Sequence, residues 1–209
     1  MHMNVLLRHA RGESGGSERD VETILTEAAI GKRRLWASSV LFAELRPSLF
    51  VPERFPALID FVRHLRSIAT FVTPDLNTML RAARLHDVQW QRPAALRRPG
   101  EKPRFLSLVD AIQLASALWV KEAADVADLE FLAFDDRDPD DGDAGRRLSL
   151  LRLQDYTDDL PIGSDVMAAV RLTRVEPVLR SQPPLQSVPA GCARPGPTDA
   201  LEPSPTPPR

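Results

Sequence analysis

The chain of 209 residues is poor in cysteine and has no long apolar run. Cys192 is its single cysteine, which excludes an internal disulfide and a zinc site built on cysteines. The longest apolar runs are a few residues, far below the roughly 18 that a membrane-spanning helix needs. The apolar stretch near the amino terminus is too short for a signal peptide. We therefore expect a cytoplasmic protein with no membrane partner.

Neither sign of charge dominates the sequence. The chain has 27 Lys and Arg against 29 Asp and Glu, a net charge of −2, so a nucleic-acid partner can be argued only from local patches. Its histidines also lack the spacing of a metal-binding motif such as HExxH. Hydrophobic residues make up 43% of the chain, which is enough for one ordinary globular core.

Aromatic residues are absent after Tyr156, and prolines crowd the chain beyond Glu176. Proline removes backbone donors, and such a segment has little apolar surface to bury. We therefore expect a folded domain over residues 1–158, a short appended helix within 159–176, and a disordered proline-rich tail over 177–209.

Helical and extended patterns alternate within the expected domain. Residue patterns and capping signals predict helices over 17–30, 40–50, 56–67, 76–88 and 107–124. Short apolar runs predict strands over 34–38, 69–73, 130–134 and 148–153. Strands separated by helices indicate βα units. The expected fold class is α/β: a three-layer α/β/α domain with a mostly parallel sheet.

Three carboxylates stand in short apolar frames: Glu44 in SSVLFAEL, Asp110 in SLVDAIQLASAL and Asp135 in LEFLAFDD. Carboxylate oxygens are the ligands that Mg²⁺ and Mn²⁺ prefer, so a pocket shared by the three would suit phosphodiester chemistry. Each acid also has an ordinary explanation. Glu44 could be a solvated helical residue, Asp110 could form a capping box with Ser107, and Asp135 could begin a solvated acidic loop.

A basic segment, VQWQRPAALRRPGEKPR over residues 88–104, precedes the Asp110 frame. Cations bind phosphate, and a tryptophan face can stack on an unpaired base. The candidate RNA-binding residues are Arg97, Arg98, Lys102 and Arg104. The alternative is an ordinary solvated loop in which Trp90 is packed against the domain.

Taken together, NVLL near the start, SSVLFAEL, SLVDAIQLASAL and FLAFDD resemble PIN domains, in particular the VapC-type toxins of toxin–antitoxin pairs. The resemblance covers about residues 3–155. It implies a metal-dependent endoribonuclease that uses Mg²⁺ or Mn²⁺, with RNA as substrate and an antitoxin protein as inhibitor. Its catalytic and metal-binding acids would be Glu44, Asp110 and Asp135, and a homodimer is left open. Supporting residues around the ligands would be Asn4, Ser38 and Ser39.

The sequence departs from this family at its start. Members begin with a hydrophobic strand that ends in an aspartate, and here His2 stands at the place of that aspartate. We therefore expect an amino-terminal strand that is missing or truncated. The alternatives are a degenerate module that binds RNA or a protein partner, and His2 as a substitute ligand, since imidazole suits Mn²⁺ or Zn²⁺.

Overall fold

The structure, a computed structural model, describes residues 1, 2, 5, 6, 9, 16–51, 54–134, 147–161 and 164–177. The predictions for Asn4, for Asp135 and for the tail beyond Pro177 fall outside these residues. One compact unit runs from Met1 to Val178. Within the described ranges, no helix combines the length and the apolar character that crossing a bilayer requires.

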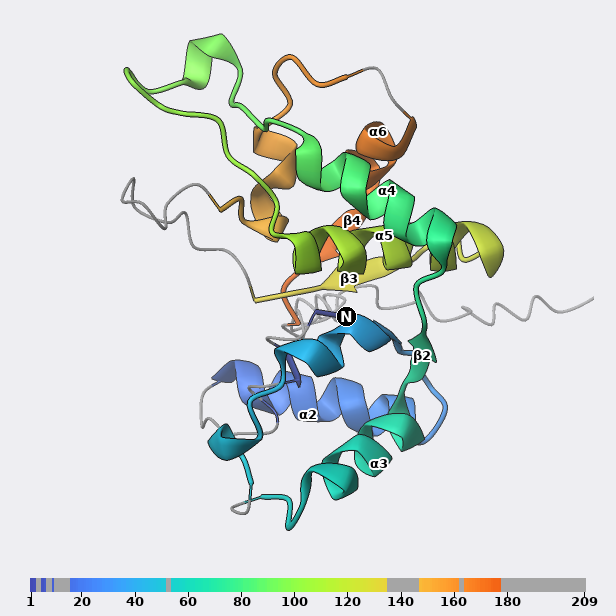
Figure 1. The fold of residues 1–209 in the computed structure, drawn as a ribbon. Helices are drawn as coiled ribbons and strands as arrows, with labels where there is room; N and C mark the ends of the chain where they lie inside the picture. The colour runs from blue at the N-terminus through green and yellow to red at the C-terminus, as the bar shows by residue number, and fades with distance from the viewer. Residues whose placement is uncertain are drawn as a thin grey trace, which may run out of the picture. The chain divides into compact units, whose positions relative to one another are not determined.

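Helices and short strands alternate along the described chain (Figure 1). The elements are α2 (Gly16–Ala29), β1 (Trp36–Ser38), η1 (Ser39–Glu44), η2 (Pro47–Leu49), α3 (Leu58–Ile68), β2 (Thr70–Val72), α4 (Leu76–Asp87), η3 (Ala94–Leu96), α5 (Leu108–Ala123), β3 (Glu130–Leu132), η4 (Leu150–Asp155), α6 (Ser164–Arg171) and β4 (Thr173–Val175).

Two of the predicted elements have a different type in the structure. The helix expected over 40–50 is a pair of 3₁₀ helices, η1 and η2, because Pro47 interrupts the run. The strand expected over 148–153 is the 3₁₀ helix η4. Leu150 and Leu153 are buried, but periodicity alone cannot separate a short buried helix from a buried strand.

The strands pair in parallel, as predicted for βα units. β1 pairs with β2 from Trp36 opposite Thr70, and β3 pairs with β4 from Glu130 opposite Thr173. Each pairing is a separate two-stranded sheet within the described residues. The described chain is therefore a mixed helical and parallel-stranded domain with two short parallel sheets.

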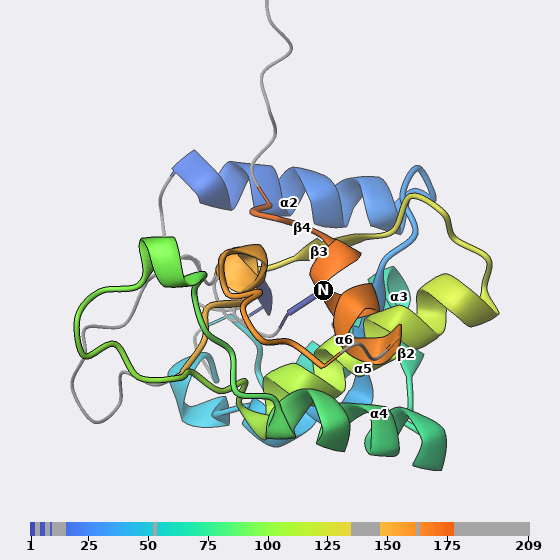
Figure 2. The same cartoon turned by 90° about the horizontal axis from the view of Figure 1, so that it is seen from above.

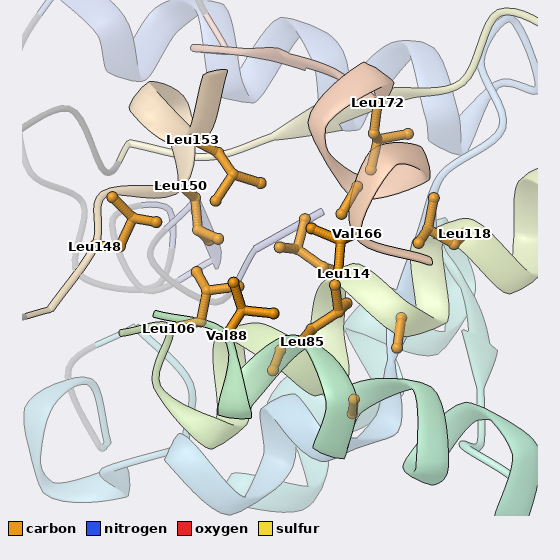
Figure 3. Close-up of a cluster of buried hydrophobic side chains, with 14 of the residues drawn as sticks. Leu85, Val88, Leu106, Leu114, Leu118, Leu148, Leu150, Leu153, Val166 and Leu172 are labelled. Carbon is orange, nitrogen blue, oxygen red and sulfur yellow. The ribbon is translucent and has the colours of Figure 1, made fainter. Parts of the chain in front are cut away.

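The larger hydrophobic cluster lies among α4, α5, η4 and α6. Leucines of η4 point toward Val88 and Leu106, beside the ends of α4 and α5 (Figure 3). Residues 159–176, expected as an appended helix, form α6 and β4. Val166 and Leu172 of this segment are buried in the same cluster, so α6 packs as part of the compact unit.

A second hydrophobic cluster joins the amino terminus, α2, β1, η1 and α3. Leu41 of η1, Phe61 and Leu65 of α3 are completely buried there. Helix α2 lies along one edge of the view in Figure 2. The candidate acids come from both clusters, because Glu44 ends η1 and Asp110 lies in the first turn of α5.

Candidate functional site

Helix α5 begins with the cap that the sequence predicts. The Ser107 hydroxyl accepts a hydrogen bond from the backbone N–H of Asp110 at 3.1 Å. The same hydroxyl donates to Oδ2 of Asp110 at 2.5 Å. Asp110 therefore satisfies the cap and also faces the positive end of the helix dipole, which favours its ionised form.

Asp110 is completely buried, and two further side chains donate to it. Nε2 of His2 lies 2.9 Å from Oδ1. The Arg147 guanidinium donates to Oδ2 from Nη2 at 2.8 Å and from Nε at 3.1 Å. His2 is itself buried, whereas the Arg147 side chain is 51% exposed, so the guanidinium is the outer boundary of this cluster.

These donors determine the charge of the Asp110 carboxyl. Burial raises its pKa, but the hydrogen bond from His2, the Arg147 charge and the Ser107 hydroxyl outweigh burial. The pKa of Asp110 therefore lies below its usual value. The carboxylate is ionised at neutral pH even though no part of it contacts solvent.

Glu44 is held near Asp110 through α5. Gln113, one turn after Asp110, donates from Nε2 to Oε2 of Glu44 at 2.9 Å. Burial raises the pKa of Glu44, and the nearby negative charge of Asp110 adds to that rise. The structure thus brings two of the three predicted acids into one electrostatically coupled group.

The other expected site residues are distributed differently. Ser38 is buried, and its hydroxyl is hydrogen-bonded to Ser116 of α5 at 3.1 Å rather than to a candidate acid. Ser39 begins η1 and is half-buried. Asn4 and Asp135 lie outside the described residues, although Asp135 directly follows Phe134 at the end of the β3 segment.

The donor chemistry of the cluster suits a hard divalent cation, but its ligand count falls short. Glu44 and Asp110 offer carboxylate oxygens, the preferred ligands of Mg²⁺. No group of three histidine, cysteine, aspartate or glutamate side chains is placed to hold a metal ion among the residues described. Both Asp110 oxygens also already accept bonds from His2 and Arg147. A cation at Asp110 would therefore share the carboxylate with these donors or displace one of them.

The basic segment over residues 88–104 is partly structural. Trp90 is completely buried, so its ring is packed and not available to a base. Arg104 is 5% exposed, and its guanidinium lies 5.4 Å from the ring centre of Tyr156. Arg97 donates to Oδ2 of Asp158 at 2.5 Å. Arg98 and Lys102 are the exposed candidates for phosphate contact.

Sequence reasoning did not single out Arg147 or Gln113. Arg147 acts on an acid 37 positions away, and the two consecutive arginines after the acidic loop were the only available signal. Gln113 lies three residues after Asp110, on the same helical face, which is a usable signal once Asp110 is suspected. A role for His2 as a substitute ligand is only an alternative in the sequence analysis, and in the structure its Nε2 contacts the Asp110 carboxylate.

Comparison with protein-family models, with curated proteins and with solved structures found no match to this chain. The arrangement of the described residues is therefore the basis of the functional argument.

Proposed function

We propose that the protein is a metal-dependent endoribonuclease of the PIN, VapC-like kind, with Glu44 and Asp110 as catalytic acids. The observation that carries the proposal is the coupling of these two carboxylates, which come from elements 66 residues apart and meet through Gln113. Asp135 completes the proposed set. RNA is the proposed substrate, and a protein antitoxin would act by covering this site.

Under this proposal, Glu44 and Asp110 would hold Mg²⁺ or Mn²⁺ through their carboxylate oxygens. A cation bound there would supply a Lewis acid and a water of lowered pKa. The protein's own residues prepare the site: Ser107 and the start of α5 keep Asp110 ionised and correctly oriented. Gln113 donates a hydrogen bond to Glu44 and orients that carboxylate toward Asp110.

Arg147 is the residue best placed to meet the substrate. Its side chain is half-exposed, and a guanidinium binds phosphate oxygens as readily as it binds carboxylate. We propose that Arg147, which contacts Asp110 here, would bind a phosphate oxygen of the RNA. Arg98 and Lys102 are both exposed and would contact phosphates further along the RNA strand.

The experiment is cleavage of a pool of structured RNAs with Mg²⁺ or Mn²⁺. The parent chain is compared with Asp110→Asn and Glu44→Gln. The matched control is Asp60→Asn, at a partly exposed acid that pairs with Arg63. We expect cleavage by the parent and the control and its loss in both site variants. Equal cleavage by all four proteins would exclude this site as the catalyst.

A second candidate function is a non-catalytic module that binds RNA or a protein. The observation in its favour is that both Asp110 oxygens already accept hydrogen bonds, Oδ1 from His2 and Oδ2 from Ser107 and Arg147. This candidate predicts RNA binding that is independent of the divalent cation, with no cleavage at any cation concentration. Cleavage that increases with added Mn²⁺ and disappears with chelator would rule it out.

A further inference from the structure

Two histidines outside the Asp110 group face each other, and we call them the histidine pair. His9 belongs to the amino-terminal segment and His64 to α3, and their Nε2 atoms lie 3.2 Å apart. The ring centres are 5.4 Å apart, and the ring planes differ by 27°. The two residues are 55 positions apart in the sequence, so only tertiary packing brings them together.

The rings of the histidine pair meet nitrogen to nitrogen and not face to face. The two nitrogens are closer together than the ring centres by about the combined distance from each centre to its own nitrogen. Both Nε2 atoms therefore lie near the line that joins the ring centres. Because the planes are nearly parallel, the in-plane directions of the two nitrogens oppose each other along that line. In the structure, one Nε2 donates its hydrogen to the other.

Both rings are neutral at neutral pH. Burial and the positive charge of Arg54 lower the pKa of His9 to about 4, and the same two causes lower the pKa of His64. Glu22 of α2 acts in the opposite direction on His9, and it accepts a hydrogen bond from Nη2 of Arg54 at 3.0 Å. Imidazole binds a metal ion in its neutral form, so the pair need not lose a proton before it acts as a ligand.

The second nitrogen of His9 also has no competing role. Nδ1 of His9 is buried and has no hydrogen-bond partner within the described structure. An ion between the two Nε2 atoms would require the hydrogen they share to move to Nδ1 of its own ring. Nδ1 of His9 accepts that hydrogen without the loss of another bond. An ion therefore enters with no net release of protons.

We propose that the histidine pair is a binding site for one Cu(I) ion, held in a line between the two Nε2 atoms. Imidazole is a good ligand for copper, and monovalent copper commonly takes two ligands in a line. Metal–imidazole bonds are about 2 Å long, so the nitrogens separate by less than about 1 Å from their present distance. The ion binds with no change of oxidation state. The proposal does not depend on the ribonuclease activity.

The surroundings of the histidine pair disfavour divalent ions. Zn²⁺ takes ligands at the corners of a tetrahedron, so two imidazoles that share it converge from one side. The two nitrogens here oppose each other, and no third histidine, cysteine, aspartate or glutamate joins them in a ligand group among the residues described. The charge of Arg54 repels a divalent ion twice as strongly as a monovalent one. The apolar ring of Phe55, centred 5.6 Å from that of His64, suits a soft ion.

The test measures the Cu(I) affinity of the full chain by competition with the coloured chelator bicinchoninate under nitrogen. Cys192→Ser is present in every protein, because a thiolate is a stronger Cu(I) ligand than imidazole. We expect one ion per chain. Loss of a group that only supports a ligand costs about tenfold in metal affinity, so His9→Gln and His64→Gln should each lose at least that. The control is His86→Gln, which removes a ring bonded to the Leu106 carbonyl and should leave the affinity unchanged.

His64→Met separates the loss of a ligand from the loss of structure. A thioether is a good ligand for Cu(I), so His64→Met should bind Cu(I) more tightly than His64→Gln does. Urea unfolding checks that every variant is folded. X-ray absorption at the copper edge of the parent should show two nitrogen neighbours in a line and no sulfur.

Three results would overturn the proposal. The first is equal Cu(I) affinity in the parent and in folded His9→Gln and His64→Gln. The second is sulfur among the copper neighbours in the parent, which would place the ion on methionines. The third is Zn²⁺ binding that is tighter than Cu(I) binding and is lost in the same two variants, because the pair would then be an ordinary divalent site.

Discussion

Asp110 is completely buried and accepts hydrogen bonds from the side chains of His2, Ser107 and Arg147, whereas Glu44 is half-buried and accepts from Gln113. The pKa of Asp110 lies below its usual value and that of Glu44 lies above it, each for the reasons given above. Neighbouring carboxylates whose surroundings separate their pKa values divide the work of a site. Asp110 is suited to be a permanent anion, and Glu44 to gain and lose a proton.

The difference follows from the elements that carry the two acids. Asp110 lies in the first turn of a 16-residue α-helix, where the cap and the dipole both favour an anion. Glu44 is the last residue of the 3₁₀ helix η1, and the backbone carbonyls at the carboxyl end of a helix disfavour an anion. Substitutions that remove or exchange these surroundings give the four predictions below.

The largest effect is expected for the stability of Asp110→Ala. Removing the buried carboxylate takes away the acceptor that His2, Ser107 and Arg147 share, and we predict a loss of about 3 kcal/mol in the free energy of unfolding. Glu44→Gln should cost less than about 1 kcal/mol, because Glu44 is half-exposed. Urea denaturation measures both, and Asp60→Ala on the surface of α3 is the control. Equal losses of stability in Asp110→Ala and Glu44→Gln would contradict the difference between the two acids.

The second prediction concerns Arg147→Met, which keeps the length of the side chain and removes its charge. Removing the two Arg147 hydrogen bonds to Oδ2 of Asp110, together with a neighbouring positive charge, should strengthen Mn²⁺ binding by at least about tenfold. Titration calorimetry of the purified chain measures this affinity. Arg63→Met, at an exposed ion pair on α3, should leave it unchanged. A weaker affinity in Arg147→Met would show that Arg147 does not compete with the cation.

The part of this site that the sequence predicts depends on how far apart the interacting residues lie along the chain. Ser107 and Asp110 are three residues apart, so local capping rules foresee both the start of α5 and the placement of the acid. Gln113 and Glu44 are 69 positions apart, and Arg147 and Asp110 are 37 apart. Only the packing of η1 and of the chain around Arg147 against α5 makes these pairs, and no local pattern encodes that packing.

The fold shows the same limit. Helices with clear apolar stripes, such as α3 and α4, were predicted at nearly the observed bounds. The segment around Leu150 was predicted as a strand because its leucines form an apolar run. It is a 3₁₀ helix against α4 and α6, since tertiary packing decides the type of a short buried run.

The third prediction is that the two acids give opposite slopes of stability with pH. The folded pKa of Asp110 lies below the unfolded value of about 3.9, so its contribution is present above that pH and is lost as pH falls through the folded pKa. The folded pKa of Glu44 lies above the unfolded value of about 4.3, so stability falls as pH rises between the two.

These slopes are isolated by comparing variants, because His9, whose pKa is lowered to about 4 by burial, titrates in the same range. Asp110→Asn should remove the loss of stability below about pH 4. Glu44→Gln should remove the decline above about pH 4 and leave the low-pH loss in place. Urea unfolding at a series of pH values measures both. The same change of slope in the two variants would mean that the acids share one environment.

The smallest effect is expected for Gln113→Met, which removes the hydrogen bond to Glu44 and preserves most of the side-chain volume. That bond lowers the pKa of Glu44, so its loss should raise this pKa further, while the pKa of Asp110 stays low because its three donors are untouched. Carboxyl chemical shifts in an NMR titration follow both groups separately. Ser116→Ala, one turn further along α5, is the control. An equal rise in the pKa of Asp110 would show that Gln113 acts on both carboxylates. The surroundings of Asp110 and Glu44 would then be more alike than their hydrogen-bond partners indicate.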